Sequence, residues 1–148
     1  MKNLTYIFDL DGTLADITHR LHYITGVEKD WDAFFAACED DAPIGPTMML
    51  LDSILANGLG VEIWTGRSSA VREQTERWLN KHGVYGVKVV MREEGDHRHD
   101  TVIKKEWLDA LPGICRAKIA AVFEDRASVV KMWRDSGLVC YQVAPGDF

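Results

Sequence analysis

Five short apolar runs alternate along this chain with longer amphipathic segments, and this alternation constrains the fold more than any other feature of the sequence. The runs lie at Leu4–Phe8, Gly60–Trp64, Val87–Met91, Lys118–Phe123 and Val139–Val143. Their apolar residues are nearly continuous rather than alternating, which is typical of strands that are buried on both faces. Strands that alternate with helices predict an α/β fold, in which a parallel sheet carries helices on both faces.

Helix signals fill the longer segments between these runs. A proline at a first helical position, a serine cap and glycine stops mark the helix ends. The expected helices run from Pro46 to Asn57, from Ser68 to about His82, over Thr101–Leu111 and over Ser128–Ser136. Because each lies between two expected strands, they supply the crossovers that a parallel sheet requires.

Residues 17–44 interrupt this pattern directly after the first strand. The segment is irregular and acidic, and its one helical patch is Trp31–Cys38. Within that patch Trp31, Phe34 and Phe35 lie at helical spacing, which favours packing inside the segment over stacking on a base. We interpret 17–44 as a small flap inserted into a single domain of residues 1–148, because no linker or repeat divides the chain.

The net charge of −6, from 17 basic and 23 acidic residues, limits the partners of this chain. An acidic protein does not bind a long stretch of nucleic acid through its phosphates, so we expect no extended duplex-binding surface. A few local arginines could still bind one phosphorylated end. No apolar run is long enough to span a membrane and the first residues do not form a signal peptide, so we expect no membrane contact and a cytoplasmic location.

The cysteines and histidines fit no metal-site spacing. Cys38, Cys115 and Cys140 are widely separated and odd in number, so we expect reduced, buried thiols. The five histidines match no zinc pattern and are expected to lie at the surface or to cap helices. Two of them, His97 and His99, lie in a loop that could contact a phosphate.

Charged and polar side chains follow four of the expected strands at their carboxyl ends. They are Asp9 and Asp11 after the first strand, Thr65-Gly66-Arg67 after the second, Arg92 with the later Asp100 and Lys104 after the third, and Glu124-Asp125 after the fourth. In open α/β sheets ligands bind beyond the carboxyl ends of the strands, where the strand order reverses. Any one of these groups could be a solvated turn, but four of them indicate a functional site at this edge.

Four carboxylates in this set favour a bound cation. They are Asp9, Asp11, Glu124 and Asp125. At one edge of a sheet they would repel one another unless a positive charge neutralised them. Oxygen-only ligands suit a hard cation that keeps several waters, which predicts Mg2+. The alternative is that these acids are helix caps and turn residues.

The same edge could carry out phosphoryl transfer. A carboxylate such as Asp9 can act as a nucleophile and form an aspartyl-phosphate. Asp11 lies on the same side of an extended chain, where it could protonate the leaving oxygen and later activate water. The Thr65 hydroxyl and the Lys104 ammonium could bind phosphoryl oxygens and neutralise charge in the transition state. Together these residues predict a phosphomonoesterase.

Four motifs resemble those of the haloacid dehalogenase (HAD) superfamily, in the same order. FDLDGTLAD, residues 8–16, resembles the first motif, in which the first aspartate is the nucleophile and the second is the general acid/base. WTGR at 64–67, Lys104 and FEDR at 123–126 resemble the second, third and fourth motifs. The resemblance spans residues 4–143 and implies a Rossmann-like sheet, Mg2+ as the cofactor and hydrolysis of a phosphomonoester.

Two further segments are similar to the 3′-phosphatase domains of phage polynucleotide kinase/phosphatases. They are REEGDHRHDTVIKKEW at 92–107 and CYQVAPGDF at 140–148. This similarity implies a 3′-phosphate on a nucleic-acid end or a nucleotide as the substrate, and it favours Lys104 over Lys105 as the third-motif lysine. It also implies substrate-binding roles for Arg20, Arg67 and Asp100. With Gly66 of the second motif and Arg92, the expected substrate-binding group is Arg20, Gly66, Arg67, Arg92 and Asp100.

Three departures from the phage relatives change what is expected. The chain has no G-x-x-x-x-G-K-[ST] loop, so we expect no kinase activity from it. The fourth motif carries Glu124 and Asp125 where the relatives have two aspartates. We expect Asp125, Asp9 and the backbone carbonyl of Asp11 to hold Mg2+, with Glu124 in support. The flap also differs, so substrate choice could have changed there.

Two other functions remain open at this point. The acidic surface is compatible with a phosphatase of free nucleotides or other small phosphorylated metabolites. The chain could also be a catalytically silent binding module, although an inactive relative would not need the full set of acids, hydroxyl and lysine.

Overall fold

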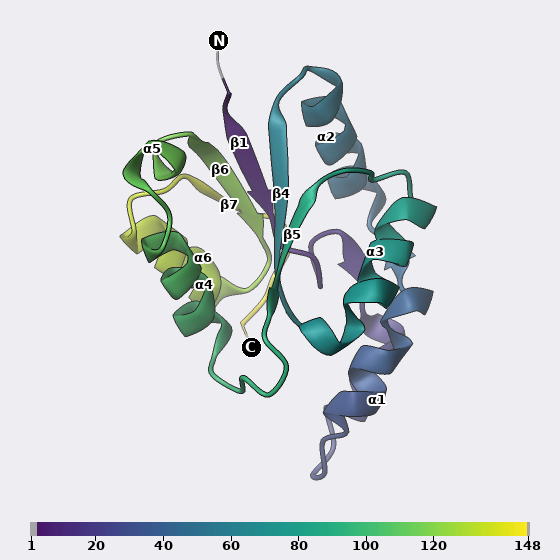
Figure 1. Ribbon diagram of the computed structural model, residues 1–148. Helices are drawn as coiled ribbons and strands as arrows, with labels where there is room; N and C mark the ends of the chain where they lie inside the picture. The colour runs from purple at the N-terminus through teal and green to yellow at the C-terminus, as the bar shows by residue number, and fades with distance from the viewer. Residues whose placement is uncertain (1–2, 148) are drawn as a thin grey trace.

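A five-stranded parallel sheet forms the centre of the computed structural model, which describes residues 3–147 (Figure 1). The strands are β1 (Thr5–Phe8), β4 (Gly60–Ser68), β5 (Lys88–Arg92), β6 (Ile119–Glu124) and β7 (Cys140–Gln142). Their order across the sheet is β5-β4-β1-β6-β7, and every neighbouring pair is parallel. The predicted α/β fold is confirmed.

The strand order reverses next to β1. The chain runs from β1 outward through β4 to β5, then crosses to the other side of β1 and continues from β6 to β7. The carboxyl ends of β1 and β6 therefore border the crevice in which sheets of this kind bind ligands. Asp9 follows β1 and Asp125 follows β6, so the two predicted acidic motifs meet at this crevice.

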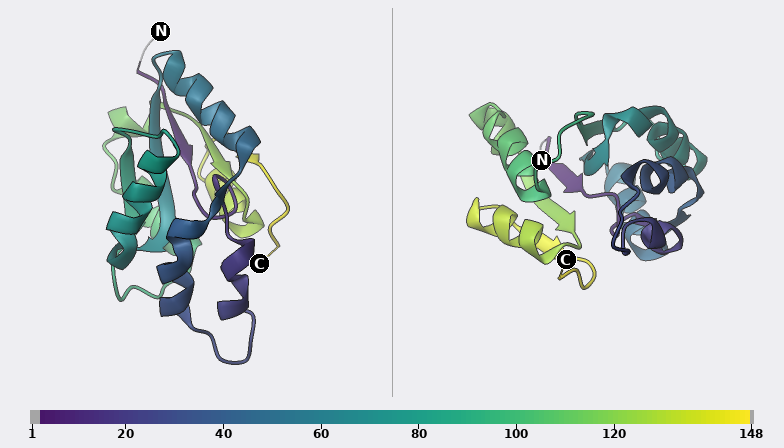
Figure 2. Two further views of the ribbon diagram at one scale, coloured as in Figure 1. Left: turned by 90° about the vertical axis from the view of Figure 1, so that its right-hand side faces the viewer. Right: turned by 90° about the horizontal axis from the view of Figure 1, so that it is seen from below.

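Helices cover both faces of the sheet, as Figure 2 shows. They are α2 (Gly45–Ala56) and α3 (Arg72–Lys81) on one face, and α4 (Asp100–Asp109) and α6 (Ala127–Asp135) on the other. Successive residues of β1 point to opposite faces. Ile7 packs in the same core as Trp133, whereas Phe8 packs in the other core with Trp78. The sheet is thus fixed from both sides beneath the loops at its carboxyl edge.

The end of β4 differs from the prediction in a way that matters for the site. The strand continues beyond Trp64 to Ser68, so Thr65, Gly66 and Arg67 lie within it rather than after it. A register shift between Thr65 and Ser68 interrupts the pairing of β4 with β5 and redirects the strand there. The helix predicted from Ser68 begins with a 3-10 turn, η3 (Ser69–Val71), before α3, and the short helix α5 (Gly113–Arg116) was not predicted.

Two short strands form the base of the flap, residues 17–44. These are β2 (Ala15–Asp16) and β3 (Ala42–Pro43), which pair antiparallel at its base. The flap contains η1 (Thr18–Tyr23), α1 (Trp31–Ala36) and η2 (Ala37–Asp40), so the helix predicted at Trp31–Cys38 is divided into an α-helical and a 3-10 part. In Figure 1 the flap extends toward the lower end of the molecule, to which the strand β1 points.

The cysteine prediction is only partly correct. Cys38 and Cys140 are buried, whereas Cys115 is exposed because it lies on the short surface helix α5. His99 caps α4 by accepting a hydrogen bond from the Thr101 N–H, as predicted for a capping histidine. Over residues 3–147, no helix combines the length and the apolar character needed to cross a membrane.

Candidate active site

The loop after β1 makes a tight turn at the carboxyl edge. Gly12 has a φ of +82°, a conformation that favours glycine, and its N–H donates to the Ala15 carbonyl at 2.9 Å. A Cβ at Gly12 would also collide with the Asp125 carboxylate. The turn buries Leu10 and Leu14 completely, which anchors it. The glycine of the first motif therefore lets two loops approach each other closely, and Asp9 and Asp11 both line the pocket at this edge.

Asp9 lies in an acid-rich cluster with Lys104, Glu124 and Asp125. The Lys104 Nζ atom lies 2.6 Å from Asp9 Oδ1 and 2.8 Å from Glu124 Oε2. Carboxylate oxygens of Asp9, Glu124 and Asp125 all lie within 4.8 Å of one another. All four side chains are buried. Three carboxylates thus face a single ammonium group, and the cluster carries an excess of negative charge.

The pKa values in this cluster reflect that excess. Burial, and then the charge of Glu124, raise the pKa of Asp9 to about 8 against the opposing effect of Lys104. Burial and the charge of Asp9 raise the pKa of Asp125 to about 6, and burial also raises the pKa of Glu124. Burial opposes protonation of Lys104, but the charges of Asp9 and Glu124 raise its pKa above the ordinary value. The set of buried oxygen ligands therefore fits a hard divalent cation.

Glu124 and Asp125 differ in how much of each carboxylate is occupied. Glu124 uses Oε2 for Lys104, and its Oε1 accepts the backbone N–H groups of Asp125 at 3.2 Å and Arg126 at 3.3 Å. Asp125 Oδ1 accepts a long hydrogen bond of 3.5 Å from the Thr13 hydroxyl, and neither of its oxygens pairs with Lys104 as Glu124 does. Asp125 is therefore the better placed of the two to bind a metal directly.

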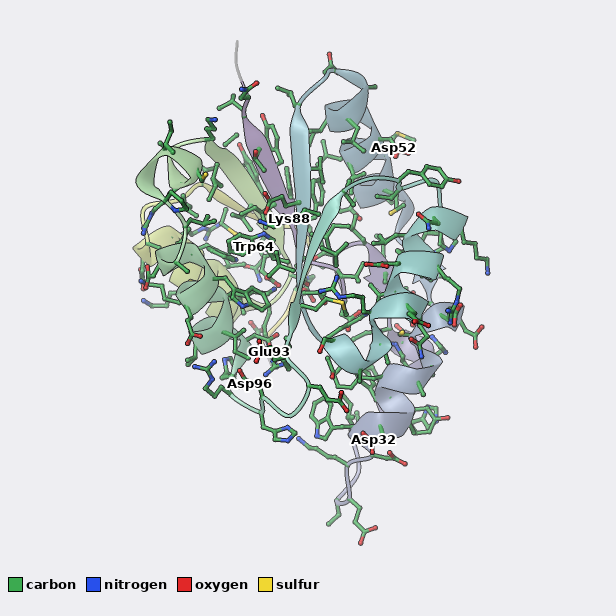
Figure 3. All side chains as sticks on the ribbon, in the orientation of Figure 1. Asp32, Asp52, Trp64, Lys88, Glu93 and Asp96 are labelled. Carbon is green, nitrogen blue, oxygen red and sulfur yellow. The ribbon has the colours of Figure 1, made fainter. Side chains whose placement is uncertain are left out.

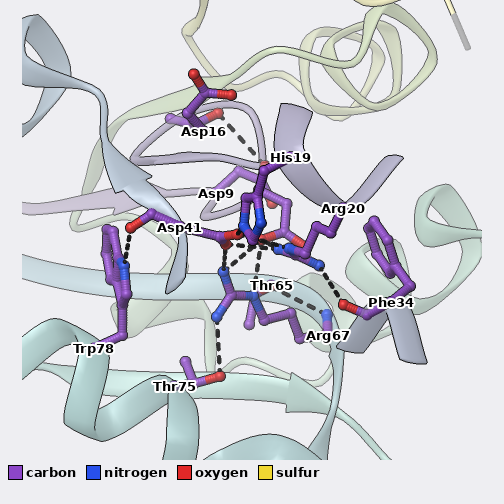
Figure 4. A network of polar contacts seen from close by, with 12 residues as sticks. Asp9, Asp16, His19, Arg20, Phe34, Asp41, Thr65, Arg67, Thr75 and Trp78 are labelled. Carbon is purple, nitrogen blue, oxygen red and sulfur yellow. Dashed lines mark hydrogen bonds and ion pairs between the residues drawn. The ribbon is translucent and has the colours of Figure 1, made fainter. Parts of the chain in front are cut away.

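Asp11 lies in a different cluster, which is closed by two arginines, Arg20 and Arg67, both labelled in Figure 4. Its Oδ1 accepts hydrogen bonds from Arg20 at 2.9 Å and from Arg67 Nε at 2.8 Å. Asp41 of the flap joins the same two arginines: its carboxylate accepts two bonds of 2.8 Å from Arg20 and one of 2.8 Å from Arg67. The Trp78 indole donates to the Asp41 carbonyl at 2.7 Å and ties the flap to α3. Here two carboxylates face two guanidinium groups.

The arginines shift the pKa of Asp11 in the direction opposite to that of Asp9. Burial alone would raise it, but the charges of Arg67 and Arg20 hold the pKa of Asp11 below its ordinary value. The Arg20 and Arg67 side chains are fully buried. In this structure both arginines therefore contact Asp11 from the buried side, and the substrate-binding role expected of them stays a prediction.

A third charged group surrounds Gly66. Arg92 Nε donates to the Gly66 carbonyl at 2.8 Å, and its guanidinium also pairs with Asp100. Arg126 reaches the same carboxylate at 3.2 Å. A Cβ at Gly66 would lie 2.7 Å from Asp100, so glycine permits this close approach. Thr65, just before, is fully buried, and its hydroxyl accepts the Arg67 N–H at 3.1 Å.

A pocket of about 580 Å3 joins these groups. Its lining includes seven of the residues predicted for the site, namely Asp9, Asp11, Gly66, Arg92, Asp100, Glu124 and Asp125. Lys104, Thr65, Arg20 and Arg67 lie behind this lining. The flap forms the facing wall with Leu21, Ile24 and Trp31, among others. The structure thus brings the predicted residues together and adds Asp41, which no sequence signal distinguished from its acidic neighbours.

Comparison with known proteins places the whole described chain in one family. The family model for the phosphatase domain of polynucleotide kinase PNKP matches residues 3–148. A curated relative from Autographa californica nuclear polyhedrosis virus, named "Putative bifunctional polynucleotide kinase/RNA ligase", is 30% identical over 130 residues. That match covers 86% of this chain but 17% of the viral protein.

Two solved structures resemble this chain along almost its whole length. A chain in the structure of the Pnkp1/Rnl/Hen1 RNA repair complex superposes with a TM-score of 0.81 at 33% identity, over 99% of this chain and 44% of that chain. The class C acid phosphatase from Bacillus anthracis superposes with a TM-score of 0.65 at 13% identity, over 99% of this chain and 70% of that chain, and shares the fold. This chain spans less than half the length of the viral relative and of the repair-complex chain that it resembles.

Proposed function

Because the chain belongs to the family of polynucleotide kinase PNKP phosphatase domains, we propose that it removes a 3′-phosphate from polynucleotide ends. The proposed cofactor is Mg2+, and the proposed intermediate is an aspartyl-phosphate on Asp9. That it is a phosphatase of HAD type follows from the family itself. The observation that carries the finer proposal is the contrast between Asp9 and Asp11. Both line one pocket, but Asp9 lies 2.6 Å from Lys104 in the cluster that would hold a cation, which keeps a nucleophile ionised, whereas Asp11 has one carboxylate oxygen that neither arginine contacts and that can carry a proton.

Asp9 performs the first chemical step. Its carboxylate oxygen attacks phosphorus, a new phosphorus–oxygen bond forms, and the bond to the leaving alcohol breaks. Lys104, 2.6 Å from Asp9, holds the carboxylate in place and neutralises charge that develops on the phosphoryl oxygens. Asp11 gives a proton to the departing oxygen. Since both arginines contact its Oδ1, the other oxygen of Asp11 can carry that proton.

In the second step Asp11 accepts a proton instead of donating one. It accepts a proton from a water molecule as that water attacks phosphorus, and the bond between phosphorus and Asp9 breaks. The arginines favour this step because they stabilise the carboxylate form of Asp11. The products are inorganic phosphate and the free carboxylate of Asp9, and Asp11 holds the proton that the next turnover needs.

Asp9 and Asp125 would hold the metal, with Glu124 positioned by Lys104 beside them. A Mg2+ ion held by these residues would neutralise negative charge on the carboxylates and on the phosphoryl group. The fit rests on the three buried carboxylates and on the close approach of Asp125 beneath Gly12. The backbone carbonyl of Asp11 is the further ligand that we propose.

The partners of the longer relatives extend the proposal to nucleic-acid repair. One similar chain lies in an RNA repair complex, and the viral relative is named as a polynucleotide kinase and RNA ligase. These names support a polynucleotide end as the substrate. Release of phosphate from free nucleotides is the second candidate, because most charged residues that line the pocket are acidic and suit a short substrate.

A panel of four substrates tests the proposal. It consists of a 3′-phosphorylated oligonucleotide, its 5′-phosphorylated twin, a free 3′-nucleotide and a free 5′-nucleotide, each with Mg2+ and with a chelator. We expect phosphate release with Mg2+, fastest from the 3′-phosphorylated oligonucleotide or the 3′-nucleotide, and none with chelator. Equal rates on all four would remove the 3′-end preference, and no release from any of them by folded protein would overturn the proposal.

A further inference from the structure

The flap wall of the pocket is apolar, and its largest residue is partly open. Trp31 at the start of α1 is 47% exposed, although its ring stacks on Phe35 with 6.0 Å between centroids and contacts the edge of Phe34 at 5.7 Å. Leu21 and Ile24 continue the wall. Packing against Phe34 and Phe35 thus covers only part of the Trp31 side chain. It holds Trp31 in place and leaves part of its surface in the same pocket as Asp9.

The cations that line the pocket are already paired with acids. Arg92 and Arg126 both pair with Asp100, and Arg98 pairs with Asp96 and Glu106. Eight acidic and three arginine side chains line the pocket. Two of these acids line opposite walls of the pocket near the lower end of the molecule in Figure 3. Glu93 lies on the loop after β5, and Asp32 lies on α1 of the flap. A phosphate there would face negative charge.

We infer that this pocket binds one terminal nucleotide, with its phosphate at Asp9 and its base on Trp31, and that recognition does not extend to the next phosphate of the strand. The inference deepens the proposed function and rests on it for the position of the phosphate. A volume of about 580 Å3 suits a ligand of this size, since small-molecule pockets span roughly 300–1,000 Å3. A base can stack on an exposed aromatic ring whatever its identity. Trp31 then selects nucleotides over phosphates that lack a base.

The first test measures selectivity for the base. The value of kcat/KM is determined for a nucleoside 3′-monophosphate and for glycerol phosphate, which has no base, in wild type, Trp31→Ala and Trp31→Phe. We expect the ratio of the two values to fall at least about fivefold in Trp31→Ala, the lower limit of base–aromatic stacking, and less in Trp31→Phe. Tyr85→Ala is the matched control, since Tyr85 is an exposed aromatic outside the pocket lining. An unchanged ratio in Trp31→Ala would overturn the inference.

The second test measures the reach of recognition along the strand. We expect kcat/KM for a 3′-phosphorylated dodecamer to stay within about threefold of the value for the mononucleotide, and to depend on salt no more steeply, because each additional phosphate contact would add to the salt dependence. A dodecamer that is preferred tenfold or more, with a steeper salt dependence, would show contacts beyond the first nucleotide and would contradict the inference.

A binding measurement separates this inference from the proposed function. Adenosine carries no phosphate, so its binding can be followed by NMR through the indole N–H signals whether or not the protein is active. We expect adenosine to shift the signal that Trp31→Phe removes, and to bind Trp31→Ala at least fivefold more weakly while Tyr85→Ala binds normally. Adenosine that binds wild type and Trp31→Ala equally, or binds neither, refutes the base site. A lack of phosphate release refutes the enzyme proposal alone.

Discussion

Asp9 and Asp11 are two residues apart in the chain, yet their surroundings differ in every respect that matters for their chemistry. Around Asp9 three buried carboxylates face one ammonium, and the pKa of Asp9 rises to about 8. Around Asp11 two carboxylates face two guanidinium groups, and the pKa of Asp11 falls below its ordinary value. The acid-rich cluster requires a further cation for balance, whereas the arginine-closed cluster is complete without one. Neighbouring aspartates thus have different electrostatic surroundings because their partners differ.

The origin of the partners explains this division. The acid-rich cluster draws its members from β6 and α4 of the sheet scaffold, on one side of β1. The arginine-closed cluster draws Arg67 from β4 on the other side, and Arg20 and Asp41 from the flap region. Both aspartates line the same pocket, while Leu10 between them in the chain is fully buried. We therefore expect loss of a residue in the acid-rich cluster to affect metal binding and the covalent step. Loss of a residue in the arginine-closed cluster should affect proton transfer and the stability of the flap.

The largest expected effect comes from Asp9→Asn. If Asp9 is the nucleophile, its amide cannot form the phosphorylated intermediate, and kcat should fall by at least about 10⁴-fold, the scale seen when a covalent nucleophile is removed. Steady-state phosphate release measures this. Asp52→Asn is the control, because Asp52 is an exposed aspartate on α2 (Figure 3). Normal turnover by Asp9→Asn would require a different nucleophile.

Asp11→Asn should have a smaller effect that depends on the leaving group. Loss of a general acid costs about 10²–10⁴-fold when the leaving group is a poor one such as a ribose hydroxyl. The loss should be clearly smaller for p-nitrophenyl phosphate, whose leaving group needs no proton. The measurement is the ratio of kcat values for the two substrates in wild type and variant. The same loss on both would show that Asp11 does not act as the acid.

Asp41→Asn should reduce stability more than any other single change in the flap. It leaves two buried guanidinium groups with one carboxylate, and removal of one partner from a buried ion pair costs about 3–5 kcal/mol. Urea denaturation measures the loss. Asp40→Asn, at the exposed neighbouring position, serves as the control and should change stability little. If Asp41→Asn lowered the free energy of unfolding by less than about 1 kcal/mol, the buried arginines would not need the Asp41 carboxylate as a partner.

Magnesium should produce the smallest of these effects, on thermal stability. Mg2+ at ten times its Kd stabilises the folded protein by about 1.4 kcal/mol, which raises the melting temperature by a few degrees. Binding should tighten as the pH rises from 6 to 8, because the pKa values of about 6 for Asp125 and about 8 for Asp9 mean that protons leave these ligands over that range. Asp125→Asn should remove the shift and Asp52→Asn should retain it. Equal shifts at both pH values would contradict the assignment.

The sequence predicted the sheet and the acid-rich cluster better than it predicted the arginine-closed one. Strand ends fix where Asp9 and Glu124 lie, because parallel strands bring their carboxyl ends to one edge whatever the loops do. The partner of Arg20 could not be found this way. Asp41 lies 21 positions away at the end of an irregular segment, beside two other acids, and only the folded flap selects it.

Other differences have equally local causes. Thr65 was expected to follow its strand, but β4 continues past a register shift to Ser68, and the Thr65 hydroxyl accepts the Arg67 N–H. Trp31 was interpreted as a packing residue from its spacing, which is correct for the contacts with Phe34 and Phe35. Spacing on a short helix cannot show which part of a ring stays open to a pocket. The roles of the individual site residues and the single-domain organisation stay predictions.

The short ladder of β2 and β3 has a consequence for how relatives of this protein can diverge. The two strands bring Ala15–Asp16 and Ala42–Pro43 together, so everything between them could be exchanged for a segment of another length without moving the sheet. The segment nevertheless contributes Arg20, which contacts Asp11, and ends at Asp41, which contacts Arg20. A graft from another protein would therefore yield a working enzyme only if it brought its own arginine and its own acid. Variation in substrate preference is free to accumulate at the tip, while the two ends remain tied to the chemistry.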